Sequence, residues 1–477
     1  MKTQLTLCIS GTLLLIGMSG CEKTPERPMN VVYILADDLG YGDVGCYGQQ
    51  IIKTPNIDRM AKEGMLFTQH YAGCTVSAPS RCSLMTGLHT GHTQVRGNRE
   101  ITPEGQQPMR EDTYTLGKLM KSAGYTTGIF GKWGLGNPGS VSIPNKMGFD
   151  EFYGYNCQRQ SHSFYPDHLW HNEEKVLFPE NENNACKTYS QDLIHEQALK
   201  FIRDHKEQPF FAMLTYTLPH AELNLPHDSI YKMYENSFEE TPYIGKFDKV
   251  YGGYNTSEKP LASFAAMVSR LDKYVGDVMA ELKELGLDKN TIVIFTSDNG
   301  PWLTKHENGG SAGPLKDGKG TWWEGGFRVP AICWMPGKIN PAINDEIMTS
   351  MDLYPTFLSM AGIEQPKDLV LDGVNQTGLL FEEKHSARDE VYYWWGSELM
   401  AIRKGEWKYY FKTIKDQYLR TCKIETPAEP LLYNVETDIS ERFNQAEKHP
   451  EIVKLLIEAG EKHKKGMKIK PPVCDMM

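Results

Sequence analysis

The sequence predicts an α/β protein: a large domain with a mostly parallel sheet flanked by helices, followed by a smaller α+β subdomain with an antiparallel sheet. Three observations predict this class. Apolar runs ending at acidic residues are typical of buried parallel strands, segments with helical spacing lie between them, and an aromatic hairpin pattern follows near the C-terminus. The 477 residues exceed what one small core needs and suit two such units.

Two apolar runs have the composition of strands that could be neighbours in the large sheet. Residues 31–36 and 291–296 are mostly β-branched or apolar, which is typical of strands buried on both faces. Residues 37–38 follow the first run directly and residues 298–299 follow the second after Ser297, and all four carry carboxylate or amide side chains. Because open α/β sheets bind ligands at the carboxyl ends of their strands, these polar residues are well placed for chemistry.

Helices and loops are predicted between these strands. Apolar residues recur at helical spacing in residues 116–120 and 267–282, and both helices are expected to end at a nearby glycine. Residues 156–186 and 223–260 are instead rich in Asn, His, Tyr and Pro and lack clean periodicity. We therefore expect long loops there, which lie over the site and build a substrate pocket.

A change of composition separates the two predicted units. A charged link at 381–389 places the boundary between a large domain over residues 29–385 and a subdomain over residues 386–477. The subdomain is predicted to contain four strands, two of them joined as a hairpin, and a terminal helix with one apolar face. The strands are at 391–395, 400–403, 407–411 and 431–434, and the helix is at 450–462.

The N-terminus has the features of an export signal. Residues 1–21 contain a basic Lys2, a mostly apolar stretch over 5–18 and small residues before Cys21. This segment resembles a bacterial lipoprotein signal, which implies that Cys21 is lipidated and that residues 22–28 form a polar tether. A transmembrane anchor is the alternative, but the apolar stretch is short and contains Ser and Gly. The resemblance implies a periplasmic or cell-surface protein anchored to a membrane.

Net charge and cysteine spacing narrow the class of function. The formal net charge of −10 argues against nucleic acid as a general partner, because neutralising phosphates needs a basic surface. An anionic small substrate is compatible with it if positive charge is local. The ten cysteines are widely and irregularly spaced and show no zinc pattern, so buried free thiols are expected for most of them.

The acidic and amide residues at the two strand ends predict a metal site. Asp37, Asp38, Asp298 and Asn299 offer four hard oxygen donors, which suit Ca²⁺, or alternatively Mg²⁺, better than Zn²⁺. A single aspartate in such a place is more often a cap or turn residue. The pairing of two acids at one strand end with an acid and an amide at another favours the metal.

The most informative segment runs from Ser77 to Gly87 and reads Ser-Ala-Pro-Ser-Arg-Cys-Ser-Leu-Met-Thr-Gly. It resembles the signature of type I, formylglycine-dependent sulfatases, in which a Cys or Ser followed by x-Pro-Ser-Arg is oxidised after translation. The resemblance implies a serine-type member whose Ser77 is converted by a formylglycine-generating maturation enzyme. A serine hydroxyl without an adjacent base is a poor nucleophile, whereas a hydrated aldehyde offers one hydroxyl to attack sulfur and another to expel sulfate. The alternative is a chance Ser/Pro turn before a helix.

Cationic residues complete the predicted site. Arg81 follows Ser77 by one helical turn, so both can face the same side at a helix N-terminus that favours an anion. Three more segments resemble sulfatase motifs: Gly131-Lys132-Trp133-Gly134-Leu135-Gly136, Pro219-His220, and Gly318-Lys319-Gly320-Thr321 with 324–330 behind it. The resemblance implies that Ser77 joins the four strand-end residues as a metal ligand, Lys132 holds a sulfate oxygen, His220 protonates the leaving alcohol and Lys319 contacts substrate.

One position departs from the family pattern. Sulfatases commonly have a histidine two residues after the first catalytic lysine, where this chain has Gly134. That histidine is assigned to hydrogen-bond the formylglycine hydrate and to help release sulfate. His162, which is also expected to bind substrate, and His70 are the candidate substitutes. Three further residues are expected to line the substrate pocket or only to pack its loop: His168, Trp170 and His171.

The resemblance extends from about Asn30 through the C-terminal segment. It implies an alkaline-phosphatase-like fold and a sulfatase that hydrolyses sulfate monoesters on a carbohydrate, as an exo-acting glycan sulfatase for sulfated galactose or N-acetylhexosamine. One alternative is a phosphate or phosphonate monoester hydrolase of the same superfamily. The other is an inactive glycan-binding surface lipoprotein, which the glycine at position 134 suggests.

Overall fold

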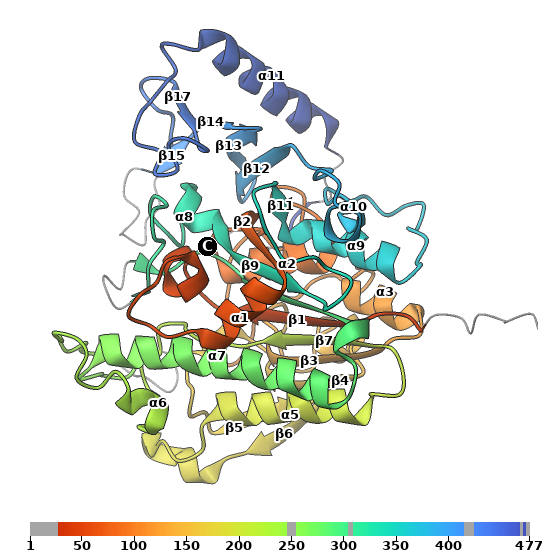
Figure 1. Cartoon of the computed structure of the whole chain (residues 1–477), viewed down its shortest axis with the longest axis vertical. Coiled ribbons are helices and arrows are strands. Elements are labelled where there is room, and N and C mark those ends of the chain that lie inside the picture. The colour runs from red at the N-terminus through yellow and green to blue at the C-terminus, as the bar shows by residue number, and fades with distance from the viewer. Residues whose placement is uncertain (1–26, 246–253, 304–308, 415–423, 468–470, 474–477) are drawn as a thin grey trace, which may run out of the picture.

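The fold is organised around one large mixed sheet and a second, smaller antiparallel sheet (Figure 1). The structure is a computed structural model that describes residues 27–245, 254–303, 309–414, 424–467 and 471–473. Both sheets have helices packed against them. This arrangement confirms the predicted α/β class with a smaller C-terminal subdomain.

The large sheet has 11 strands, and its centre is parallel. Strands β8, β1, β7, β3 and β4 lie side by side in parallel pairs, while β9 runs antiparallel between β8 and β2. The strand order is β10-β2-β9-β8-β1-β7-β3-β4-β5-β6, and β11 also pairs with β2. The bounds are β1 (Asn30–Ala36), β2 (Met65–Tyr71), β3 (Thr126–Lys132), β4 (Glu151–Tyr155), β5 (His168–His171), β6 (Glu174–Leu177), β7 (Phe210–Thr215), β8 (Thr291–Ser297), β9 (Arg328–Trp334), β10 (Ala342–Asn344) and β11 (Met348–Thr349).

Helices cover both faces of this sheet. Successive apolar side chains along β1 point to opposite faces, so both faces must be buried. Val32 and Ile34 face one core, and Val31 and Tyr33 face the other. The first core is closed by α1 (Pro55–Glu63), α5 (Ser190–Asp204) and α7 (Pro260–Glu284), and the second by α2 (Ser77–Thr86), α3 (Leu116–Ser122), α9 (Leu353–Met360) and α10 (Thr377–Phe381). Figure 1 shows α5 and α7 on one side of β1 and α2, α3, α9 and α10 on the other. Short helices are α4 (Gln158–Ser161), α6 (Ser229–Lys232) and α8 (Glu324–Phe327).

The C-terminal unit is a four-stranded antiparallel sheet with one helix packed on it. Its order is β12 (Glu390–Trp395), β13 (Glu398–Lys404), β14 (Trp407–Tyr410) and β17 (Leu431–Asn434), and β15 (Thr413–Ile414) pairs separately with β16 (Ile424–Glu425). The helix α11 (Pro450–Gly466) contacts β13 and β14. The predicted hairpin is therefore β13–β14, with β12 and β17 at its two sides.

The predicted long loops contain regular structure that the sequence did not reveal. Residues 156–186 hold α4 and the hairpin β5–β6, which extends the large sheet beyond β4. The hairpin turns at Asn172, whose φ of 55° lies in the left-handed region. Its outer strand is largely exposed, so it needs no apolar face and leaves no periodic signal. Residues 223–260 hold α6 and the first residue of α7, while 246–253 lie outside the described residues.

Six cysteines in the described part of the chain are free thiols, as expected: Cys46, Cys74, Cys82, Cys157, Cys186 and Cys333. Cys8, Cys21, Cys422 and Cys474 lie outside the described residues, as does the predicted signal.

Among the described residues, no helix combines the length and apolar character that a membrane span requires. Because Cys21 lies outside the described residues, its lipidation stays a prediction.

Candidate active site

The site begins where two neighbouring strands end. Strands β1 and β8 pair in parallel with Ala36 opposite Ser297, so the residues that follow them meet at one edge of the sheet. The backbone N–H of Asp38 donates to Asp298 Oδ1 at 3.3 Å, and Asn299 Nδ2 donates to Asp38 Oδ1 at 2.7 Å. Asp38 has a φ of 64°, an uncommon conformation for a residue other than glycine. The predicted juxtaposition of the two strand ends is present in the structure.

Helix α2 presents Ser77 and Arg81 to this edge. Ser77 is its first residue, and the Ser77 hydroxyl donates to Asp37 Oδ1 at 3.1 Å. One turn later the Arg81 guanidinium donates to Asp298 Oδ2 at 2.9 and 3.2 Å. All ten residues of α2 are buried. The serine therefore lies at a helix N-terminus, where backbone N–H groups attract an anion.

Two lysines bring positive charge to the same carboxylates. Lys132, the last residue of β3, lies 2.6 Å from Asp37 Oδ2 and is fully buried. Lys319 donates to both carboxylate oxygens of Asp38, at 2.7 and 2.8 Å. Although burial of Asp37 opposes its ionisation, Lys132 and other nearby cations hold its pKa below the usual range. The predicted cations thus converge on the predicted acids.

A histidine pair closes the side of the site next to Asp38. His220 Nε2 lies 3.6 Å from Asp38 Oδ2, and the His220 ring stacks on His162 with centroids 5.1 Å apart. Tyr254 and Trp302 complete this aromatic wall, and the Lys319 ammonium lies 5.0 Å from the Trp302 ring. Burial and the neighbouring His220 lower the pKa of His162 well below its usual range, so its ring is neutral.

The acidic groups fit a divalent metal ion. Asn299 Oδ1 is buried and has no hydrogen-bond partner within the described part of the chain, so an amide oxygen is left to bind a ligand. Burial raises the pKa of Asp38, and burial and the nearby Asp37 raise that of Asp298 to about 6. A cation between these carboxylates would favour their ionised forms. Three carboxylates already face three basic side chains, so a divalent ion would leave the site positive and suited to an anion.

At position 134, where sulfatases commonly have a histidine, this chain has a glycine with Arg81, Lys132 and Gln158 around it. Gly134 has a φ of 74°, and a Cβ placed there would lie 3.6 Å from Arg81 Cδ and 3.8 Å from Lys132 Cε. A side chain at 134 would therefore lie next to the Arg81 and Lys132 side chains. The Gln158 side chain lies beside this space, also 3.6 Å from that Cβ. Gln158 donates to Asn98 Oδ1, which also accepts from the backbone N–H next to Ser77.

Sequence reasoning missed Gln158 and Asn98, together with the aromatic wall residues Tyr254 and Trp302. Asn98 lies in a loop between α2 and α3, and Gln158 begins the four-residue helix α4, so neither is part of a periodic pattern. Trp302 lies shortly after Asp298 and Asn299, the predicted metal ligands at the end of β8. This closeness in the chain is the one signal that could have identified it.

The remaining predicted residues lie at different distances from this cluster. His162 joins it, as described above. His168 and Trp170 both contact the carboxylate of Glu104, at 3.0 and 2.6 Å, and so pack β5 against the loop that contains Glu104. His171 is exposed and packs on Tyr153. Within the described residues, the contacts of these three side chains do not connect them to Ser77.

His70 lies away from the cluster. It is buried on β2 and its ring faces the charge of Asp352 rather than that of the strand-end acids. Burial lowers the pKa of His70 to about 4. Of the two candidate substitutes for the missing histidine, the structure therefore favours His162.

Comparison with known proteins identifies the family. The Sulfatase family model matches residues 29–363, and the model described as the C-terminal region of aryl-sulfatase matches residues 386–477. The chain belongs to the sulfatase family. It is accordingly a sulfuric ester hydrolase, in agreement with the resemblance of the motif at Ser77.

This sulfatase has named relatives along most of its length. It is 34% identical over 420 residues to the N-acetylgalactosamine-6-sulfatase of Canis lupus familiaris, covering 83% of this chain and 73% of the relative. It is 31% identical to arylsulfatase A of Homo sapiens, covering 88% and 83%. The solved structure of Ps i-CgsB in complex with k-i-k-neocarrahexaose superposes with a TM-score of 0.75 at 28% identity, covering 92% of this chain and 93% of that one.

Proposed function

We propose that this sulfatase is an exo-acting enzyme that removes sulfate from a carbohydrate, using a formylglycine made from Ser77 and a bound Ca²⁺. One observation carries the proposal. The Ser77 hydroxyl contacts Asp37 at the N-terminus of a buried helix, inside a ring formed by Arg81, Lys132 and Lys319. An oxidised Ser77 side chain would therefore face both the metal-type carboxylates and the cations that an anionic ester needs.

The oxygen donors present suit calcium. Asp37, Asp38, Asp298 and Asn299 supply carboxylate and amide oxygens, which are typical Ca²⁺ ligands, and Ser77 is the proposed fifth. Calcium would draw electron density from the sulfate oxygens and acidify the hydrated aldehyde. Mg²⁺ is the alternative ion for the same donors.

The side chains around the metal-type residues have separable roles. Lys132 and Lys319 are fixed by Asp37 and Asp38, so their ammonium groups are preorganised to stabilise charge as the S–O bond breaks. His220, held 3.6 Å from Asp38, protonates the departing alkoxide. His162, stacked on His220, takes the place of the histidine absent at position 134 and assists sulfate release.

A sugar is the substrate class that the surroundings support. Tyr254 and Trp302 present aromatic rings next to His220, and such rings pack against the apolar faces of sugars. Among the similar proteins, one acts on N-acetylgalactosamine 6-sulfate by its name and another was solved with a carrageenan oligosaccharide. We propose a sulfated galactose or N-acetylhexosamine as the substrate.

We further propose that the enzyme is an exported lipoprotein, anchored to the membrane through Cys21 at the periplasmic or cell surface. The support is the basic, apolar and small-residue order of residues 1–21. The second proposed partner is the maturation enzyme that oxidises Ser77. No nucleic acid partner is expected, given the net charge of −10.

Production with and without a maturation enzyme tests this function. Mass spectrometry should show loss of two hydrogens at Ser77, and the converted protein should release sulfate from sulfated galactose or N-acetylhexosamine. Ser77→Ala should abolish release, while Ser122→Ala on α3 is the control.

Unchanged desulfation by Ser77→Ala, or an unmodified Ser77 in active protein, would refute the mechanism. Faster turnover of an aryl phosphate than of an aryl sulfate would favour the phosphatase alternative, and glycan binding without sulfate release would favour the inactive one.

A further inference from the structure

A second cluster of metal-ligand side chains lies where the C-terminal subdomain meets the catalytic domain. His89 and His92 lie in the loop after α2, Asp372 lies in the loop between α9 and α10, and His463 is near the end of α11. Candidate ligand atoms of the first three lie within 4.8 Å of one another. These residues share no sequence signal, because they come from three segments far apart in the chain.

Three members of the cluster, His89, His92 and Asp372, have the mutual spacing of ligands around one ion, and His463 contacts one of them. His463 Nε2 lies 3.0 Å from His89 Nε2, which lies 3.5 Å from Asp372 Oδ2, and His92 Nδ1 lies 3.1 Å from the same oxygen. In a tetrahedral zinc site with bonds of about 2.0–2.1 Å, ligand atoms are about 3.3 Å apart. We propose that His89, His92, Asp372 and His463 bind one divalent transition-metal ion of the Zn²⁺ class.

The chemistry of the donors separates this site from the catalytic one. Three imidazoles and one carboxylate suit Zn²⁺, whereas the catalytic cluster offers mainly hard oxygen donors. Nearby positive charge is compensated, since Arg388 pairs with Asp352 and Lys404 pairs with Glu390. Arg388 also donates to the backbone carbonyl of Asp372 at 2.7 Å, so neither cation takes the Asp372 carboxylate as its ion-pair partner.

Neighbouring groups fix the orientation of the proposed ligands. The His89 ring stacks on Trp394 with centroids 5.4 Å apart, and the His463 ring stacks on Tyr392 at 3.6 Å. Asp372 Oδ2 also accepts the backbone N–H of His89 at 3.0 Å. Such outer contacts hold metal ligands in position and limit the entropy lost on binding.

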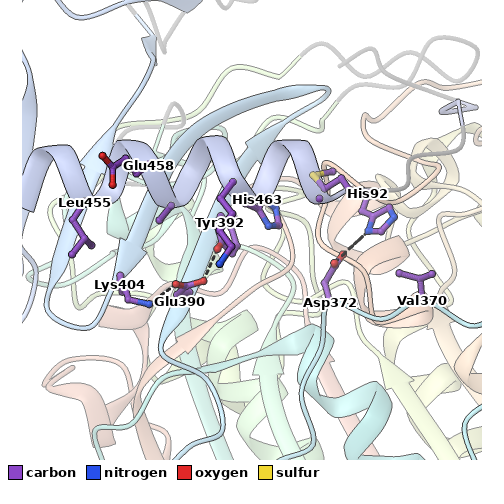
Figure 2. A pocket seen from close by; sticks show the side chains of 13 residues that line it. His92, Val370, Asp372, Glu390, Tyr392, Lys404, Leu455, Glu458 and His463 are labelled. Atoms are coloured by element: carbon purple, nitrogen blue, oxygen red, sulfur yellow. Dashed lines mark hydrogen bonds and ion pairs between the residues drawn. The ribbon is translucent and has the colours of Figure 1, made fainter.

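An open groove gives an ion access to the cluster. A cavity of about 770 Å³ lies beneath α11 and is lined by His92, Asp372 and His463, among other residues. Figure 2 shows the His92 and Asp372 side chains pointing at each other across this groove, with His463 reaching down from the helix. A bound ion would connect α11 to the loop that follows α2, the helix that carries Ser77. The site would therefore tie the C-terminal subdomain to the catalytic domain.

Calorimetric titration with Zn²⁺ tests the proposal on the full mature chain with Ser77 unmodified, in excess Ca²⁺ to occupy the catalytic oxygens. We expect one Zn²⁺ per chain at this site. His463→Gln and His92→Gln should each weaken that binding by about tenfold or more. His171→Gln, which removes an exposed histidine elsewhere, is the matched control and should change nothing. Thermal unfolding with and without Zn²⁺ should show stabilisation of the wild type that both ligand variants lack.

Three results would overturn the inference. One is the absence of Zn²⁺ binding by the folded wild type, and another is binding that is unchanged by either ligand substitution. The third is an equal loss of binding in the His171→Gln control, which would indicate nonspecific surface coordination. Unmodified Ser77 makes this test independent of the proposed sulfatase mechanism, because the protein need not be catalytically active.

Discussion

The buried imidazole of His70 couples the stability of this sulfatase to pH. Burial lowers its pKa to about 4, whereas an unfolded histidine has a pKa of about 6.5. Between these values the unfolded chain binds a proton that the folded chain does not, so stability rises with pH through this window and is lost on acidification. Both ring nitrogens of His70 lack a hydrogen-bond partner within the described structure. Protonation in the folded state therefore gains no hydrogen bond, and the charge of Asp352 offsets only part of the cost of burial.

We predict that His70→Gln flattens the pH dependence of unfolding between pH 4 and 6.5. Urea denaturation should show that the wild type loses about 1.4 kcal/mol per pH unit more than the variant across that window. His171→Gln, which changes an exposed histidine, should leave the slope as it is in the wild type. Parallel pH profiles for wild type and His70→Gln would contradict the assigned burial effect.

The space beside Gly134 offers a test of how the formylglycine is reset. His162→Ala should lower kcat by about 100-fold or more, because it removes the imidazole proposed to assist sulfate release. A second substitution, Gly134→His, should restore part of that loss, since a side chain at 134 lies against Arg81 and Lys132. The double variant should be less stable by about 1–2 kcal/mol, owing to the positive φ at position 134. Steady-state kinetics on fully converted protein measures both effects.

Two controls sharpen this rescue. Gly134→Ala carries the backbone cost without the imidazole and should restore no activity to His162→Ala. An unchanged kcat for His162→Ala would contradict the assigned role. The rescue tests whether His162, stacked on His220, assists sulfate release. Because that step belongs to turnover, the effect should appear in kcat and not in KM.

Whether a site residue could be predicted depended on the sequence immediately around it. Asp37 and Asp298 were identifiable because each directly follows a buried strand, and parallel neighbours bring such residues together. Ser77, Lys132 and Lys319 were identified by motif and not by physical pattern. His70 was misplaced, because being close to Ser77 in the sequence says nothing about the face of β2 on which a side chain lies. Gln158 had no periodic or motif signal at all.

Helix α2 places a constraint on when Ser77 can be modified. Ser77 has no exposed surface, and the whole helix is buried between the sheet and neighbouring helices. We predict that a maturation enzyme converts a synthetic peptide spanning residues 70–90 but not the folded, unmodified protein. Mass spectrometry after equal incubation measures the difference. A peptide carrying Arg81→Ala serves as the negative control, and equal conversion of peptide and folded protein would contradict the prediction.

Elements with strong apolar runs were predictable, and those at sheet edges were not. Strands β1 and β8 and helix α7 were predicted from composition and spacing, because each is buried against several neighbours. The β5–β6 hairpin joins the rest of the sheet only through β5, and β6 is mostly exposed, so its residues resemble a loop. Strand β9 contains Pro330 and follows a glycine-rich helix, which hides it from strand patterns.

The two units of the molecule are joined by a buried ionic network. Lys408 on β14 lies 2.8 Å from Glu324 on α8 and 3.2 Å from Glu441, and these three side chains have no exposed surface. Tyr71 on β2 and Tyr393 on β12 also donate to Glu324. The network spans the interface immediately behind the loop that carries Lys319. Composition predicts a boundary between the units at the charged link 381–389, whereas this pairing of distant charges left no sequence signal.

Removing the central lysine should destabilise the whole molecule in a pH-dependent way. Although burial opposes ionisation of Glu324, Lys408 and Arg403 lower its pKa to about 2. Lys408→Met would leave two buried carboxylates without this partner, and we expect a loss of about 3–5 kcal/mol at pH 7. Because Glu324 would then be protonated more readily, the deficit should shrink as the pH falls from 7 to 5.

Urea unfolding of Lys408→Met at several pH values tests this account of the interface. Adding Glu441→Gln should recover part of the lost stability, because it removes one of the two stranded charges. Lys454→Met, which changes an exposed lysine on α11, is the control and should have almost no effect. A deficit that grows on acidification would contradict the argument, since it would mean that Glu324 stays ionised without Lys408. A two-step transition in the variant would show that the network also makes the two units unfold together.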